Sequence, residues 1–161
     1  MSDNSLSRAV VDALKRMSLT VFTAESCTGG LISKMITDVS GASDVIKGGI
    51  VCYVNEIKTS LLGVKEETIK EYTEVSEQCC YEMAECARRI SGADIGLSTT
   101  GYASSGATVP PEMVGVVYIG ISDSFGTSVF RLHLEGDRNE VRTSAACELL
   151  EVLISRLEAY E

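Results

Sequence analysis

Helical and strand patterns alternate along the whole chain, and this alternation limits the folds that it can adopt. Apolar residues at helical spacing predict a first helix over 4–17, and the apolar run that follows predicts a strand ending near Ala24. The same reading predicts helices over 28–37, 56–62, 76–91 and 139–159, and strands over 44–54, 93–101, 114–122 and 128–136. Helices interleaved with apolar strands predict an α/β fold, with helices on both faces of a mostly buried, mixed sheet.

The length of 161 residues suits one such domain with one sizeable core. Because no linker and no internal repeat interrupts the pattern, 1–161 is expected to form a single three-layer domain. Within it, Gly48 and Gly49 predict a bulge, Gly63 a helix C-cap and Ser76 a helix N-cap. The buried stripe of the helix after Ser76 is expected to contain Cys80, Met83, Ala84, Ala87 and Ile90.

The charge balance argues against a general nucleic-acid-binding protein. The formal net charge is −9, whereas phosphate neutralisation requires clustered lysine and arginine. One phosphorylated small molecule needs only a few donors in one pocket and remains compatible with this charge. The N-terminus carries no apolar segment like that of a signal peptide, and no apolar run reaches 18 residues. A cytoplasmic protein without membrane association is therefore expected.

Cysteine and histidine usage disfavours a metal site. The chain has six cysteines, no C-x-x-C pair and one histidine, so no zinc site is expected. Most of the cysteines lie on apolar faces of predicted elements. Their thiols are expected to be reduced and to pack as small core residues.

The stretch TAESCTGG contains two potential nucleophiles, Ser26 and Cys27, where a predicted strand gives way to a helix. Free N–H groups at a helix N-terminus favour an anion or a developing oxyanion, and Gly29 and Gly30 let a ligand approach the backbone. The alternative is an ordinary N-cap serine at a packed turn. Spacing alone favours this second interpretation.

A histidine base for either nucleophile is not expected. The only histidine, His133, falls on the polar side of an amphipathic strand and should be exposed. Cys27 would need a depressed pKa and normally a histidine partner. A serine nucleophile here would need a different base, and Ser-Lys arrangements are one solution.

The stretch CYVNEIK offers such a lysine. Tyr53 and Asn55 alternate onto one face at a predicted strand end, and Lys58 follows one turn into the next helix, so the three polar groups could converge. A lysine acts as a base only when burial or a neighbouring cation makes its neutral form accessible. The alternative is a solvated lysine next to an ordinary strand aromatic.

The stretch GDRNEVR places Arg138 and Arg142 four residues apart on one face of a helix start. Two guanidinium groups there could clamp a phosphate or a carboxylate. The commoner alternative is surface pairing with Asp137 or Glu140.

Together these stretches, with SGASDVIKGGIV, VSEQ, GADIGLSTTGYA and VGVVYIGI between them, resemble the C-terminal domain family of CinA from about residue 6 to residue 155. Stand-alone members of that family include nicotinamide mononucleotide deamidases. The resemblance implies a serine amidohydrolase of pyridine nucleotide salvage that converts nicotinamide mononucleotide to nicotinate mononucleotide and ammonia. It implies no metal and no organic cofactor.

The resemblance also implies roles for individual residues. Ser26 would be the nucleophile, with Lys58 and Tyr53 as its proton-transfer partners. The substrate-binding residues would be Thr28, Gly29, Gly30, Asn55, Thr100, Gly101, Arg138 and Arg142. In this set, backbone N–H groups from Thr28 to Gly30 would stabilise the oxyanion, and Arg138 or Arg142 would bind the phosphate.

The loop over 102–113 departs from the family, whose members usually continue TG-I-A-G-P-G-G. Here Ser104, Ser105 and Gly106 replace the Gly-Pro-Gly core. Two alternatives therefore stay open, a non-catalytic nucleotide-binding or regulatory module and the same chemistry on another amide. A homo-oligomer is also expected, because 45% apolar residues in a small α/β domain can leave a patch to bury.

Overall fold

The computed structural model describes residues 3–160 and confirms the mixed α/β fold. Its single sheet has the strand order β2-β1-β3-β4-β5. The strands are β1 (Val21–Glu25), β2 (Ile46–Val51), β3 (Ile95–Gly101), β4 (Val116–Asp123) and β5 (Gly126–His133). The α-helices are α1 (Asp3–Met17), α2 (Leu31–Thr37), α3 (Asn55–Ile57), α4 (Glu66–Tyr72), α5 (Glu77–Ser91) and α6 (Arg138–Leu157).

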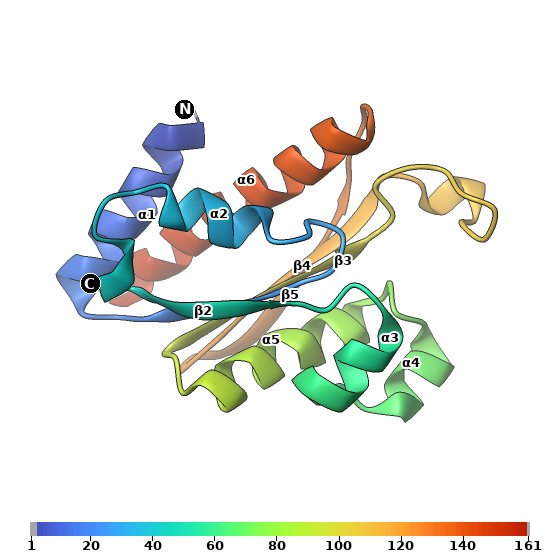
Figure 1. The fold of residues 1–161 in the computed structure, drawn as a ribbon, viewed down its shortest axis with the longest axis horizontal. Helices are drawn as coiled ribbons and strands as arrows, with labels where there is room; N and C mark the ends of the chain where they lie inside the picture. Colours follow the sequence, from blue (N-terminus) through green and yellow to red (C-terminus); the bar gives the residue numbers. More distant parts are fainter. Residues whose placement is uncertain (1–2, 161) are drawn as a thin grey trace.

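The helices form two layers, as predicted. In Figure 1, α1, α2 and α6 cover the upper face of the sheet, and α5 covers the lower face together with α3 and α4. The larger apolar cluster joins α1, α2 and α6 to the sheet, whereas a smaller one joins α5 to β1 and to the segment after β2. The buried apolar residues of both clusters hold the three layers together.

Strand direction determines where the loops meet. β1 pairs in parallel with both β2 and β3, whereas β4 and β5 continue the sheet in antiparallel pairing. The carboxyl ends of β1, β2 and β3 therefore lie at one end of the sheet, on the right of Figure 1. Segments that follow parallel strands in an open sheet commonly form the ligand site at that end.

The cysteines pack as the sequence predicts. All six are free thiols, and five are buried, Cys147 being the partly exposed one. Burial raises the pKa of Cys27 to about 12, that of Cys52 to about 11 and that of Cys79 to about 12. Such thiols stay protonated at neutral pH and behave as small apolar groups.

Local expectations are mostly confirmed. A register shift opposite Val21 and Phe22 marks the bulge before Gly48, Gly63 forms a left-handed C-cap, and Ser76 caps α5. The prediction that Ile90 is buried is wrong, because this residue lies beyond the buried stripe of α5 and is 43% exposed. The short helix α4 was not predicted, since its sequence EETIKEY has a single aliphatic residue and no amphipathic pattern.

Several boundaries also differ from the prediction. α2 begins at Leu31 because Gly29 and Gly30 adopt left-handed conformations, and β2 ends at Val51. The helix expected over 56–62 begins one residue earlier, and its second half, Lys58–Leu62, is a π-helical turn. Among the helices of residues 3–160, none is both long and apolar enough to cross a membrane.

One ion pair, between the partly exposed Arg156 and the buried Asp123, ties the last helix to the sheet. Arg156 donates to both carboxylate oxygens of Asp123 at 2.7 and 2.8 Å, and the Phe125 N–H donates to the same carboxylate at 2.8 Å. Burial opposes ionisation of Asp123, but these hydrogen bonds outweigh it and lower the pKa of the carboxyl. The ionised form is therefore the one that stabilises the fold.

Asp123→Asn is expected to lower the free energy of unfolding at pH 7 by about 3 kcal/mol, because Arg156 loses its buried partner. Since the pKa is lowered on folding, this contribution is complete above the unfolded-state pKa, about 4, and is lost at lower pH. Urea unfolding at a series of pH values measures it. The difference between wild type and variant should shrink in acid, whereas Asp12→Asn, on the exposed face of α1, should show little difference at any pH.

Candidate active site

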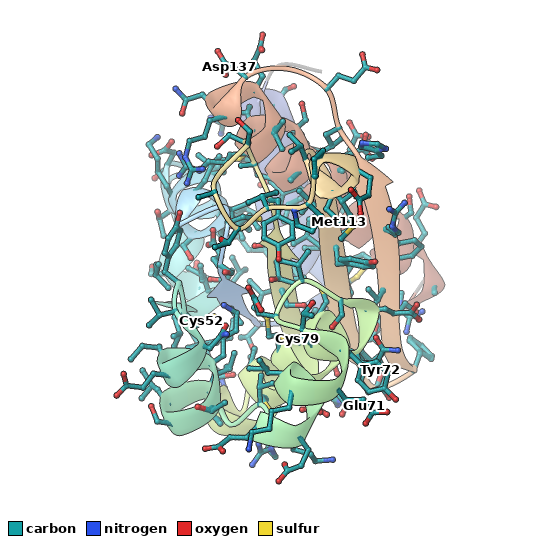
Figure 2. The ribbon with its side chains drawn as sticks, turned by 90° about the vertical axis from the view of Figure 1, so that its right-hand side faces the viewer. Cys52, Glu71, Tyr72, Cys79, Met113 and Asp137 are labelled. Carbon is teal, nitrogen blue, oxygen red and sulfur yellow. The ribbon has the colours of Figure 1, made fainter. Side chains whose placement is uncertain are left out.

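A cavity of about 480 Å³ opens at the carboxyl ends of β1, β2 and β3. This volume lies within the roughly 300–1,000 Å³ typical of small-molecule sites. Figure 2 faces this end of the molecule, with Met113 and Asp137 above and Cys52 and Cys79 below. Outside the loop over 102–113, the lining residues are Ser26, Cys27, Tyr53, Val54, Asn55, Lys58, Glu74, Val75, Thr100, Gly101 and Arg138.

Ser26 occupies the first position after β1, on the turn that leads into α2. Its N–H donates to the carbonyl of Thr99 at 3.0 Å, which continues the pairing of β1 with β3 by one residue. Ser26 is 8% exposed and lines the cavity. The parallel sheet therefore holds the backbone of this serine while its side chain reaches the cavity.

The carboxylate of Glu25 stabilises the turn by accepting hydrogen bonds from it. One of its carboxylate oxygens accepts from the Thr28 hydroxyl and from the N–H groups of Gly30 and Ile32, and the other accepts from the N–H and hydroxyl of Ser33. The side chain of this buried residue thus satisfies the free N–H groups at the start of α2. Sequence reasoning missed Glu25, although an acidic residue directly before a helix N-terminus was a usable signal.

Lys58 is the direct partner of Ser26. Its Nζ lies 3.1 Å from Ser26 Oγ and 3.5 Å from the carbonyl oxygen of Tyr53, and the residue is only 1% exposed. The N–H groups of Gly63 and Val64 both donate to the Lys58 carbonyl, which closes the π-helical turn. Tyr53, Asn55 and Lys58, the three polar groups expected to converge, all line this cavity, and the interpretation of Lys58 as a solvated lysine is wrong.

The other candidate nucleophile and base are less suited to reaction. Burial keeps the Cys27 thiol protonated, as its raised pKa indicates, so little thiolate is available at neutral pH. His133 is exposed, as predicted, and its Nε2 lies 3.2 Å from the Val114 carbonyl. It does not line the cavity. The geometry therefore pairs Ser26 with Lys58 rather than with a histidine.

The side chain of Tyr53 points to a different partner than the resemblance implies. Its hydroxyl accepts a hydrogen bond from Arg138 Nη2 at 2.6 Å, and only its backbone carbonyl contacts Lys58. Because β2 ends at Val51, Tyr53 lies in the segment between β2 and α3, and Asn55 is the first residue of α3. Both residues are exposed. Both still line the cavity.

Arg138 connects two rims of the cavity. Besides the Tyr53 hydroxyl, it donates through Nη1 to Ser104 Oγ at 3.1 Å. The expected alternative, surface pairing with Asp137 or Glu140, is not observed within residues 3–160, because these two carboxylates form the capping box of α6. The charge of Arg138 at the cavity mouth has no carboxylate partner in that part of the chain.

Arg142 lies behind the serine turn and does not line the cavity. Its Nε donates to the Cys27 carbonyl at 3.0 Å and its Nη2 to the Thr28 carbonyl at 2.8 Å. A Cβ atom at Gly29 would lie 3.3 Å from the same Nη2, so a small residue allows this close approach. Of the two arginines, only Arg138 is placed to meet a ligand.

The N–H groups of the turn divide into two sets. Gly29 donates to the Ser26 carbonyl and Gly30 to Glu25, so the donors expected at the two glycines are used inside the turn. The Thr28 side chain is also engaged, with Glu25 and Thr99. Within the part of the chain that the structure describes, the N–H groups of Cys27 and Thr28 have no acceptor.

Thr100 and Gly101 line the cavity at the end of β3, as expected. The Thr100 hydroxyl donates to the Glu74 carbonyl at 2.7 Å, and a Cβ atom at Gly101 would lie 2.6 Å from the Val116 carbonyl oxygen. Tyr102 and the loop beyond it form the remaining wall, through Tyr102, Ala103, Ser104, Ser105, Thr108 and Val109. In residues 3–160, no three His, Cys, Asp or Glu side chains gather as a metal site would require.

Comparison with known proteins finds a matching domain family and similar proteins. The profile of the CinA C-terminal domain matches residues 3–157. The chain is 42% identical over 158 residues to a CinA-like protein of Thermotoga neapolitana and 45% identical over 151 residues to one of Dictyoglomus thermophilum. These matches cover 98% and 94% of the chain but only 38% and 37% of the two relatives, so the chain spans less than two fifths of their length.

Solved structures extend the likeness to the whole fold. The competence damage-inducible protein A of Klebsiella pneumoniae superposes with a TM-score of 0.94 at 28% identity, and the match covers 100% of both chains. A competence or damage-inducible protein of Enterobacter asburiae gives a TM-score of 0.93 at 30% identity, covering 98% of this chain and 99% of that one.

Proposed function

The chain belongs to the CinA C-terminal domain family, and on this basis we propose that it is a serine amidohydrolase acting on nicotinamide mononucleotide. The products would be nicotinate mononucleotide and ammonia, which makes the reaction a step of pyridine nucleotide salvage. The observation that carries the proposal is the 3.1 Å contact between Ser26 Oγ and Nζ of the buried Lys58, inside a cavity of suitable size. A serine paired with a lysine is a known arrangement for acyl transfer.

The chemistry proceeds in two steps. Lys58, in its neutral form, accepts the Ser26 proton while Oγ bonds to the carboxamide carbon. The resulting ammonium of Lys58 then donates that proton to the leaving nitrogen, the C–N bond breaks and ammonia departs, leaving an ester on Ser26. Water attacks this ester with Lys58 again accepting a proton, and the proton returns to Oγ as nicotinate mononucleotide leaves. In this geometry Lys58, rather than the Tyr53 phenol, is the immediate base.

The oxyanion that forms on the carboxamide oxygen needs donors beside Ser26. We assign this role to the N–H group of Cys27, because Cys27 lines the cavity and this donor of the turn has no acceptor among residues 3–160. The N–H of the residue after the nucleophile is used in this way in other serine hydrolases. Such a donor is worth about 3 kcal/mol of transition-state stabilisation. Glu25 and Arg142 then serve to position the turn that carries it.

Arg138 is the residue proposed to bind the phosphate. Its guanidinium lies at the mouth of the cavity without a carboxylate partner among the described residues, and both of its recorded acceptors are neutral hydroxyls. A phosphate would be the stronger acceptor because its hydrogen bonds are charge-assisted. The contact between Arg138 and Ser104 also involves the loop over 102–113 in this subsite. The same chemistry on another amide, or binding without turnover, are the alternatives that a substrate series separates.

Arg138→Gln is expected to lower kcat/KM for nicotinamide mononucleotide by roughly 10–100-fold, the range for losing a charged hydrogen-bonding partner. Turnover of nicotinamide riboside, which lacks the phosphate, should change little. Ammonia release from both substrates by wild type and variant measures this difference. An equal loss on both substrates would remove Arg138 from the phosphate subsite, and turnover of neither by the wild type would contradict the assigned substrate.

A further inference from the structure

Glu74 is a carboxylate in the cavity that the reaction above does not use. It lies between α4 and α5, and its backbone carbonyl accepts the hydrogen bond from the Thr100 hydroxyl, so the end of β3 holds it in place. Glu74 lines the same cavity as Ser26 and Lys58. Within residues 3–160, its carboxylate has no hydrogen-bond or ion-pair partner.

Tyr102 lines the same cavity, near enough to Glu74 for its phenol to be affected by the charge of that carboxylate. Burial raises the pKa of its phenol, and the negative charge of Glu74 raises it further. An aromatic side chain beside an unpaired carboxylate is an arrangement that suits a cation. The ring quadrupole and the negative charge both attract a positive ligand group.

The charges that line the cavity therefore have both signs. Arg138 at the mouth is positively charged, and Glu74 is the acidic residue of the lining. A cavity that bound only an anionic nucleotide would gain nothing from Glu74, because a carboxylate repels a phosphate. A ligand that carries a phosphate at one end and a cation at the other would match both.

We propose that Glu74 and Tyr102 form a subsite for the positively charged ring of an N-substituted pyridinium. This inference rests on the proposed function, since nicotinamide mononucleotide carries that charge on its ring nitrogen, in the ring that bears the carboxamide under attack. The subsite would discriminate N-substituted, cationic pyridines from neutral ones. Glu74 is thus a specificity-determining residue, separate from the serine and lysine that perform the chemistry.

Binding of two small probes tests the subsite without relying on turnover. The probes are 1-methylnicotinamide, a cation, and nicotinamide, its neutral counterpart, each titrated into wild type and Glu74→Gln with calorimetric detection. Wild type should bind the cation about tenfold more tightly, as expected for one opposite charge and one aromatic face at a partly solvated site. Glu74→Gln, which keeps the side-chain size, should bind both probes with nearly equal affinity.

Three further variants make the result specific. Glu67→Gln changes the net charge equally on the exposed side of α4 and should keep the preference for the cation. Tyr102→Leu should weaken that preference, whereas Tyr102→Phe should retain it. Equal affinities of wild type for the two probes, including no measurable binding of either, would overturn the subsite. A preference that survives in Glu74→Gln would overturn it as well.

Ammonia release from nicotinamide mononucleotide is measured on the same wild-type preparation. Absence of release together with a cation preference that depends on Glu74 would contradict the amidohydrolase proposal and support the subsite. Release without such a preference would support the amidohydrolase and overturn the subsite. The two proposals therefore fail separately.

Discussion

Replacing Ser26 with alanine is expected to lower the rate of ammonia release from nicotinamide mononucleotide by at least about 10⁴-fold, the scale seen when a serine hydrolase loses its nucleophile. The variant removes only the Oγ atom that lies 3.1 Å from Lys58 Nζ. The turn should persist, because the backbone hydrogen bond from Ser26 to Thr99 and the contacts of Glu25 remain. Substrate affinity should therefore change far less than turnover.

Two matched variants accompany Ser26→Ala. Ser105→Ala removes a hydroxyl from the loop wall of the same cavity and should leave most of the activity. Cys27→Ala should also retain activity, because burial raises the pKa of that thiol and keeps it protonated. Loss of turnover in Cys27→Ala, with turnover kept in Ser26→Ala, would transfer the nucleophile to the cysteine.

Replacing Lys58 with methionine is expected to have an effect of similar size, about 10³–10⁴-fold on turnover, because the nucleophile and its base act as a unit. Methionine matches the length of the buried stem and fills the site that Lys58 occupies, so the fold should survive. Steady-state kinetics with a thermal unfolding control measures both consequences.

Lys58→Arg distinguishes a base from a mere positive charge. An arginine side chain stays protonated in proteins and cannot accept the Ser26 proton, so this variant should be as inactive as Lys58→Met. Lys70→Met, on the exposed surface of α4, provides the control for losing one positive charge. Substantial turnover in Lys58→Arg would show that Lys58 acts only through its charge and would contradict its role as base.

The fold was accessible from the sequence because its signals are local. Apolar periodicity located α1, α5 and α6 within one or two residues, and Ser76 marked the start of α5 through its cap. α2 starts later than predicted because Gly29 and Gly30 adopt left-handed conformations that extend the turn. The hydrogen bonds that Glu25 accepts stabilise this turn. The five hydrogen bonds of Glu25 span residues 28–33 and leave no periodic pattern in the sequence.

The site was accessible only in part. The sequence suggested that the serine of one motif could use the lysine of the other as its base. The parallel pairing of β1 with β2 brings Ser26 and Lys58 together. The separate tasks of Arg138 and Arg142 could not be read from their spacing, because each depends on a partner far away in the sequence. Glu74 was not predicted as a site residue for the same reason, since only its contact with the end of β3 places it in the cavity.

Release of ammonia and nicotinate mononucleotide from nicotinamide mononucleotide, by purified wild-type protein with Ser26→Ala in parallel, tests the central claim most directly. The Ser26–Lys58 pair predicts that the wild type releases the two products in equal amounts and that the variant releases neither above background. Release at the same rate from both proteins, or none from a folded wild type, would contradict it.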